Sequence, residues 1–301
     1  MNKMEKRALI ADLALLGVAV IWGGGFVAAK MALEDVTPFY VLGLRVFGAG
    51  LILTLFFWKK LKTASKKSLK TGMLLGVLLF IGQGMQMVGL QYTEAGKQAF
   101  LVASYTLLIP FVSWAVSKRR PPWVAMLAGA LTLVGIGCLS LNSNFTMSYG
   151  DLLSLASAVF FAVHITLIGY FAHQGDPIPL TVMQLLTGGI LSLMVAFLFE
   201  PSVQMVSRQS MLAIGYLMII NTAIAFTVQN MAQKYTTATH SSVIMSLESV
   251  FGMLISIVLL NEIFTTRMAI GCGIIFCAVL ISQFDKDGLP SPKEEESEVS
   301  I

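Results

Sequence analysis

Residues 238–260, ATHSSVIMSLESVFGMLISIVLL, form an almost continuously apolar run with one carboxylic acid, Glu248, near its middle. A run of about 20 apolar residues is long enough to cross a hydrocarbon core of about 30 Å as an α-helix. At 1.5 Å per residue, Glu248 lies roughly 14 Å into that helix, close to the bilayer centre. A carboxylate there costs about 2.5 to 3.5 kcal/mol on insertion scales, so we expect the fold to offset this cost.

Similar runs recur along the whole chain of 301 residues. Only 12% of the residues are charged and 56% are apolar, whereas about 25% are charged in an average soluble domain. The runs are continuous rather than alternating, which favours helices over the strands of a barrel. The predicted fold class is therefore an all-α integral membrane protein with ten transmembrane helices. The predicted spans are 8–31, 38–58, 70–91, 97–117, 121–141, 149–172, 177–199, 211–233, 238–260 and 265–284.

Basic residues indicate which side each loop faces, because cytoplasmic loops are enriched in lysine and arginine. If the N-terminus is cytoplasmic, the loops on the opposite side contain only Lys97, Arg208 and Arg267. The cytoplasmic segments then contain Lys3, Lys6, Arg7, Lys59, Lys60, Lys62, Lys66, Lys67, Lys70, Lys118, Arg119, Arg120, Lys234, Lys286 and Lys293. We therefore expect a multi-pass protein of the cell membrane, a plasma or bacterial inner membrane, with both termini in the cytoplasm.

The composition also disfavours several classes of partner. The formal net charge of +4 reflects the loop asymmetry rather than a basic patch, so we expect no nucleic acid partner. Cys138, Cys272 and Cys277 lack metal-ligand spacing, and we predict no metal and no cofactor.

The basic N-terminal stretch precedes an apolar run that is too long for a signal peptide, so we expect a retained first span. Residues 285–301 are predicted to be a disordered acidic cytoplasmic tail.

The two halves of the chain resemble each other. A shift of 139 residues pairs Trp22 with Phe161, Pro38 with Pro177, Arg45 with Gln184 and Gly50 with Gly189, and a shift of 143 pairs Gln86 with Gln229, Tyr92 with Tyr235, Ala95 with Ala238 and Tyr105 with Glu248. Each half has five predicted spans, and because five is odd the second half enters the membrane from the opposite side. We predict a first five-helix repeat over 1–145 and a second, inverted repeat over 146–284.

Inverted repeats indicate a transporter. They place two similar surfaces face to face, with a substrate site near the membrane midplane that either half can uncover. The sequence therefore predicts a secondary active carrier that works by alternating access. A hydrolase would need a nucleophile with its base or a metal-binding motif, and the sequence contains neither, so we expect no enzyme activity.

Three segments also resemble a known family. SLESVFGMLISIVLLNE, Ser246–Glu262, is similar to the box near the end of EamA-type repeats in the drug/metabolite transporter superfamily. IWGGGFVAAK, residues 21–30, resembles the first-span signature, and LQYTEAGKQAF, residues 90–100, resembles the entry to the fourth span. Arg45 resembles the arginine that such proteins often carry in the second span. The resemblance implies a ten-helix carrier that moves small metabolites, often outward, without ATP hydrolysis.

The sequence departs from that box at two positions. Ser249 replaces its usual proline and Asn261 its frequent glycine. A kink that depends on the proline is therefore not expected in the ninth span.

Two ionisable residues are candidates for the substrate site. Glu248 shares a helical face with small or adaptable residues, so it can bind a substrate ammonium or a coupling proton, or instead serve as a structural hydrogen-bond partner. His164, in the sixth span, can relay protons or orient a carboxylate, although a lone histidine on an apolar helix is often a packing residue. Possible proton coupling rests on these two residues.

The remaining candidates are amides and amphipathic aromatics. Amides inside a membrane either join helices or line a wet cavity, and aromatic faces can hold an ammonium. The cavity candidates of this kind are Gln83, Gln86, Asn221, Gln229, Trp22 and Tyr105. Arg45 is predicted to snorkel to the outer interface or to pair with a carboxylate. Gly72 and Gly76 are expected to set a close helix contact, either internal or between protomers.

These features predict export of a small metabolite of amino-acid or amine type through a central midplane cavity. The alternative is a broad multidrug exporter of lipophilic cations, for which the seventeen methionines and the many aromatics would provide an adaptable cavity. The expected partners are a small-molecule substrate and the lipid bilayer. The chain is expected to act as a monomer or homodimer.

Overall fold

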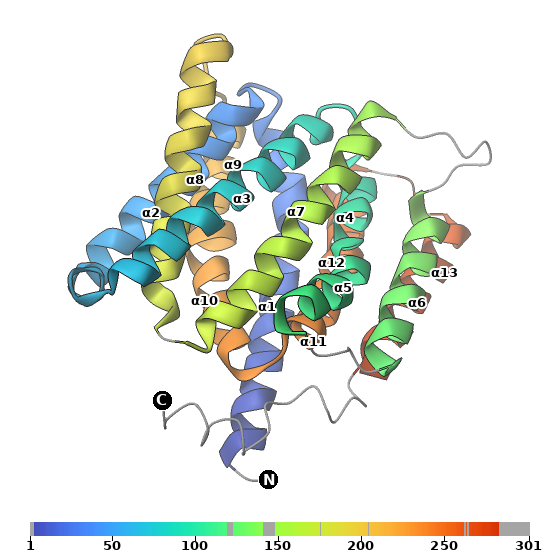
Figure 1. Ribbon diagram of the computed structural model, residues 1–301. Helices are drawn as coiled ribbons and strands as arrows, with labels where there is room; N and C mark the ends of the chain where they lie inside the picture. The colour runs from blue at the N-terminus through green and yellow to red at the C-terminus, as the bar shows by residue number, and fades with distance from the viewer. Residues whose placement is uncertain are drawn as a thin grey trace.

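The computed structural model describes residues 3–118, 123–140, 148–174, 176–203, 205–261, 263 and 265–282, and these residues form a bundle of helices without a strand (Figure 1). The predicted tail at 285–301, the predicted repeat boundary at 145 and 146, and the basic residues Arg119, Arg120, Lys286 and Lys293 lie outside the described residues. The first half contains α1 (Lys3–Ala32), α2 (Pro38–Thr63), α3 (Lys66–Leu90), α4 (Ala95–Ala103), α5 (Tyr105–Ser117) and α6 (Trp123–Ser140). The second half contains α7 (Tyr149–Ala172), α8 (Pro177–Phe199), α9 (Arg208–Tyr216), η1 (Leu217–Ile224), α10 (Ala225–Ala232), η2 (Gln233–Tyr235), α11 (Ala238–Met245), α12 (Glu248–Leu260) and α13 (Thr266–Ser282).

The helices follow the predicted spans closely. Within the described residues, eight helical segments are long and apolar enough to cross a membrane, and shorter apolar stretches lie in α6 at Met126–Gly135 and in α13 at Ala269–Ala278. Large apolar side chains such as Phe197 and Val258 are 70% or more exposed on the outer surface of the bundle, where acyl chains would surround them. The chain is therefore a multi-pass α-helical membrane protein.

Three predicted continuous spans are interrupted. The fourth breaks at Ser104, between α4 and α5, and the ninth breaks at Ser246 and Leu247, between α11 and α12. The hydroxyls of Ser104 and Ser246 each donate to a backbone carbonyl three residues earlier at 2.7 Å, and such back-bonding bends helices. The break before Glu248 therefore forms without a proline at position 249, so it is not the proline-dependent kink of the family box. The eighth span contains the π-helix η1, which is a wider coil than the sequence predicted.

The ends of α5 and α12 share an uncommon backbone conformation. Lys118 at the end of α5 has φ of 59°, and Asn261 at the end of α12 has φ of 56°. Both positions are left-handed helical caps, a conformation that glycine adopts most easily and that asparagine tolerates better than most residues. This conformation explains why asparagine can replace glycine at position 261.

Helices α2 and α8 pack against each other in opposite directions. At the start of α2, Thr37 Oγ1 donates to Glu200 Oε2 at 2.6 Å, at the end of α8. At the start of α8, Asp176 Oδ2 accepts from Lys60 Nζ at 2.7 Å, near the end of α2. Burial raises the pKa of Asp176, but the hydrogen bonds from Lys60 and from the Ile178 backbone, together with the positive charges of Lys60 and Lys234, outweigh burial, so the pKa lies below its ordinary value. The two helices are therefore tied together at both ends.

Glycines allow the helices around α8 to approach closely. A Cβ on Gly76 of α3 would lie 2.7 Å from the backbone oxygen of Gln184 and from Thr187 Cβ, and one on Gly72 would lie 2.6 Å from Met183 Cβ. These distances are shorter than van der Waals contact. The predicted Gly72 and Gly76 contact is therefore internal, between α3 and α8.

We predict that Gly76→Ala lowers the melting temperature of the detergent-purified protein. The added methyl group meets backbone atoms of α8 that have no free space to move into, which corresponds to an overpacking cost of about 1 to 3 kcal/mol. The matched control is Gly17→Ala in α1, where a Cβ would meet nothing within 4 Å. Equal melting temperatures for Gly76→Ala and Gly17→Ala would contradict the close α3–α8 contact.

Candidate functional site

A cavity lies among α1, α2, α3, α4, α5, α7, η1, α10 and α12 in the described part of the chain. Its volume is about 70 Å³. All eight side chains predicted for the substrate cavity line it: Trp22, Gln83, Gln86, Tyr105, His164, Asn221, Gln229 and Glu248. Residues that are far apart in the sequence, from both halves of the chain, therefore meet in one space.

Glu248 and Tyr105 occupy equivalent positions in the two halves of the chain, and their side chains lie next to each other in this cavity. Each is the first residue after a helix break, with Tyr105 at the start of α5 and Glu248 at the start of α12. Glu248 is 3% exposed and lies beside the Tyr105 hydroxyl, although that hydroxyl makes no hydrogen bond of good geometry within the described residues. A helix N-terminus carries a partial positive charge, so the break before Glu248 stabilises a carboxylate inside the bilayer. This arrangement offsets part of the insertion cost expected for Glu248.

His164 faces the cavity and is also held from behind by a neighbouring helix. Its Nε2 lies 2.8 Å from Gln184 Oε1 of α8, and its ring meets the edge of Phe226. The bond orients the imidazole and leaves its other nitrogen for a different partner. The sequence did not suggest Gln184 as a site residue, although the shift of 139 pairs it with Arg45.

Asn221 is a fixed point of the cavity wall. Its Nδ2 donates to the backbone oxygen of Ile21 at 3.0 Å, and its own backbone oxygen accepts from Trp22 Nε1 at 3.1 Å. Asn221 belongs to the π-helix η1, and such bulges often occur at functional sites. The sequence suggested Asn221 only as one amide on an apolar helix, because a π-helix has no distinct sequence pattern.

Several polar atoms of the cavity wall have no protein partner. Gln83 Oε1 and both side-chain polar atoms of Gln229 are buried without a hydrogen bond among the described residues. Because buried polar atoms are nearly always satisfied in folded proteins, these amides are arranged to face water or a polar ligand. Of the two interpretations left open for the amides, the geometry favours a wet cavity over helix joining for Gln83 and Gln229.

The expectation that Arg45 snorkels to the interface is wrong. Its side chain is 6% exposed and lines the cavity, where its Nη1 donates to Asn221 Oδ1 at 3.3 Å. Seven residues separate it from Pro38 at the start of α2, so the nearer aqueous surface was within reach of a long side chain. The packing of α2 against η1 turns it inward instead.

The remaining walls of the cavity are apolar. They consist of Phe26, Ala29, Met87, Leu90, Val102, Phe161, Ile165 and Phe226, together with Gly25. Sequence analysis did not single these residues out, because most of the chain is apolar and no pattern separates a cavity wall from a lipid-facing surface. Among the described residues, no group of three or more histidine, cysteine, aspartate or glutamate side chains is arranged to hold a metal ion.

The fold and cavity define a multi-pass membrane transporter, and comparison with known proteins places the chain in a family. The model of the EamA-like transporter family matches residues 9–141 and again residues 148–284. The chain belongs to the EamA-like transporter family of the drug/metabolite transporter type.

Two similar proteins are named as uncharacterized transporters. An uncharacterized transporter of Archaeoglobus fulgidus is 34% identical over 91% of this chain and 86% of its own length. The uncharacterized inner membrane transporter YedA of Escherichia coli is 27% identical over 70% of each chain. A protein of known crystal structure has a TM-score of 0.75 at 20% identity, covering 90% of this chain and 96% of its own, and this likeness concerns the fold alone.

We predict that the cavity is hydrated. In a variant without native cysteines, Gln86→Cys should react with a water-soluble thiol reagent, because position 86 lines the polar cavity. Val258→Cys, on a side chain that is 74% exposed on the outer surface of α12, should be protected by detergent or lipid. Labelling of Val258→Cys at the same rate as Gln86→Cys would argue against a water-accessible cavity.

Proposed function

We propose that this protein is a secondary active exporter of small amino-acid or amine-type metabolites that works by alternating access. The two halves, 1–145 and 146–284, act as inverted five-helix repeats, and α6 and α13 complete ten membrane crossings. Three observations support this arrangement: the family model matches twice in tandem, α2 and α8 are antiparallel, and the breaks before Tyr105 and Glu248 are equivalent.

The proposed orientation places both termini in the cytoplasm of a cell with this carrier in its cell membrane. The basis is the distribution of basic residues, since loops with most of the lysines and arginines remain inside. Lys59, Lys60 and Lys62 at the end of α2 all belong to such a loop. The description of YedA as an inner membrane transporter is consistent with this location.

The size of the cavity supports a small substrate. One water molecule needs roughly 10 to 15 Å³ of such space, so a cavity of 70 Å³ holds about five to seven waters. This space suits a small metabolite better than a large lipophilic cation, which disfavours the multidrug alternative. No observation on the site favours that alternative specifically.

The observation that carries the proposal is a carboxylate, Glu248, buried in a cavity between the two halves of the chain. A single carboxylate can hold either a proton or a substrate ammonium, but not both at once. Competition for Glu248 would therefore couple the outward movement of substrate to the inward movement of a proton. His164, which is held in place by Gln184, would orient the bound group from another wall of the cavity.

We predict that the protein, reconstituted into vesicles, moves amino acids or amines when a pH gradient is applied. Glu248→Gln should reduce this flux at least about tenfold, because the amide cannot bind an ammonium as a counter-ion or carry a proton. His164→Ala should reduce flux less, since His164 is proposed to orient rather than bind. Flux is measured with radiolabelled substrates.

The matched control is Glu34→Gln, which removes a carboxylate on the exposed loop after α1 and should leave flux unchanged. Transport with Glu248→Gln at the rate of the original protein would remove the proposed role of Glu248. If no member of a broad amino-acid and amine panel moves under any gradient, the proposed substrate class is wrong.

A further inference from the structure

Arg45 is a buried cation without a counter-ion among the described residues. Its guanidinium makes one hydrogen bond, from Nη1 to Asn221, and its Nε has no partner. Ionisable side chains inside a bilayer usually pair with an opposite charge, because an isolated charge in a medium of low polarity is costly. A guanidinium in this position is a site for an anionic group.

The orientation of Arg45 is set by the protein and not by the ligand. Asn221 is itself held by Ile21 and Trp22 through hydrogen bonds, and its Oδ1 accepts from Arg45. The Nε of Arg45 therefore remains available while the guanidinium is held in place. Donors fixed in advance in this way suit the planar, two-oxygen geometry of a carboxylate.

Glu248 supplies the opposite charge in the same cavity. It comes from α12, whereas Arg45 comes from α2, and no ion pair joins the two side chains. The cavity therefore presents a guanidinium and a carboxyl group that come from different helices. An amine would satisfy Glu248 but leave Arg45 unpaired, and a simple carboxylic acid would do the reverse. A zwitterion satisfies both.

We infer that Arg45 binds the carboxylate of the substrate while Glu248 binds its ammonium, so the substrate class is α-amino acids rather than amines. This inference rests on the proposed function and narrows its substrate class. It adds Arg45 as a residue that determines specificity.

The test uses three matched ligand series, built on alanine, leucine and phenylalanine. Each series compares the amino acid with the amine that lacks its carboxylate and with the acid that lacks its ammonium. Binding to the purified protein is measured by isothermal titration calorimetry. We expect at least one amino acid to bind about tenfold or more tightly than both of its partners, since each lost charge pair weakens binding by such a factor.

Arg45→Gln should remove the preference for the amino acid over the amine while leaving binding of the amine unchanged. Arg45→Lys keeps the charge but not the two-donor geometry. Its preference for the amino acid over the amine should therefore lie between those of the original protein and Arg45→Gln. If Arg45→Gln does not fold, Asn221→Asp provides the second test, because its carboxylate would pair with Arg45 internally and weaken amino-acid binding.

Equal binding of amine and amino acid, or an unchanged preference in Arg45→Gln, would overturn the inference. Failure of all three amino acids to bind would also overturn it. In those cases the protein could still transport amines in vesicles. Failure of this inference is therefore distinguishable from failure of the proposed carrier.

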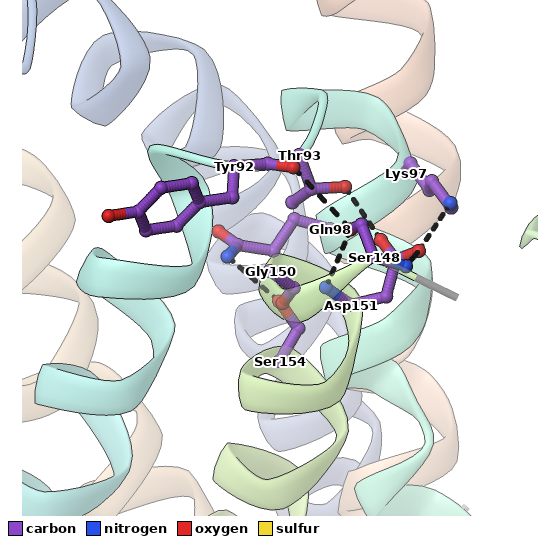
Figure 2. Close-up of polar contacts among 8 residues, drawn as sticks. All are labelled: Tyr92, Thr93, Lys97, Gln98, Ser148, Gly150, Asp151 and Ser154. Carbon is purple, nitrogen blue, oxygen red and sulfur yellow. Dashed lines mark hydrogen bonds and ion pairs between the residues drawn. The ribbon is translucent and has the colours of Figure 1, made fainter. Parts of the chain in front are cut away.

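A separate observation concerns two pairs of side chains at opposite ends of the bundle, one an ion pair and the other a histidine–aspartate hydrogen bond. Lys97 Nζ, in the first turn of α4, lies 2.6 Å from Asp151 Oδ2, in the first turn of α7 (Figure 2). His240 Nε2, in the first turn of α11, lies 3.1 Å from Asp12 Oδ1 of α1. Figure 1 shows α11 and the N-terminal part of α1 at one end of the bundle, with the starts of α4 and α7 at the other.

The two pairs are equivalent under the internal repeat. The shift of 139 residues pairs Asp12 with Asp151, and the shift of 143 pairs Lys97 with His240. Each pair also joins the first half of the chain to the second. Asp151 is 1% exposed and accepts further hydrogen bonds from Thr93 Oγ1 at 2.8 Å and from the Ser148 backbone at 2.9 Å, which fixes its carboxylate (Figure 2).

We propose that these pairs are the two latches of alternating access, each closing one end of the cavity. Lys97 and Asp151 hold the halves together at one end, and Asp12 and His240 hold them at the other. This proposal rests on the proposed mechanism, but its test measures access to the cavity and requires no substrate.

Access is measured with Gln86→Cys in the cysteine-free background, using a membrane-impermeant thiol reagent on right-side-out and inside-out vesicles. Lys97→Gln should raise labelling roughly three- to tenfold from one face, and His240→Gln should do so from the opposite face. Lys66→Gln, on an exposed lysine of α3, is the matched control and should change neither rate.

A second measurement replaces the ion pair by a covalent bond that can be broken on demand. A disulfide between Lys97→Cys and Asp151→Cys should block labelling from the first face and release it on reduction. Increased labelling from the same face in both glutamine variants, no increase in either variant, or unchanged labelling of the cross-linked protein would overturn the latch proposal.

Discussion

Hydrocarbon offers no hydrogen bonds, so every polar group inside this bundle must be satisfied by the protein or by the contents of its cavity. Most polar side chains within the helices make hydrogen bonds to nearby groups of the protein. The hydroxyls of Ser104, Ser246 and Thr166, for example, donate to carbonyls of their own helices. Arg45, Gln83 and Gln229 are exceptions, because each keeps an unpartnered polar atom. These three residues line the cavity, whereas other unpartnered polar atoms, such as those of Gln98, Asn230 and Gln233, belong to residues that do not line it.

The same constraint explains why the helices around the cavity are irregular. A continuous α-helix satisfies its backbone internally and offers nothing to a ligand. The breaks before Tyr105 and Glu248 and the π-helix around Asn221 interrupt that pattern within the depth of the bundle. Irregular backbone is tolerated there because it borders a polar space and not lipid. The helix start behind Glu248 then adds a favourable dipole to the carboxylate.

Close packing on one side of the bundle complements these breaks. Glycines let α3 and α8 approach within backbone contact, and polar bonds tie α2 to α8 at both ends. The two halves of the chain thus meet along a closely packed surface as well as around the cavity.

Much of this protein follows from its sequence. The length and continuity of the apolar runs determine the helices, because a bilayer accepts few other structures, and Glu248 is conspicuous because a central acid is costly. The eight polar or amphipathic candidates also converge as expected, since such side chains avoid lipid. The tertiary structure alone decided the inward direction of Arg45, the contact of His164 with Gln184, and the π-helix at Asn221. These depend on which helix packs behind each side chain, and periodicity within one segment carries no information about its neighbours.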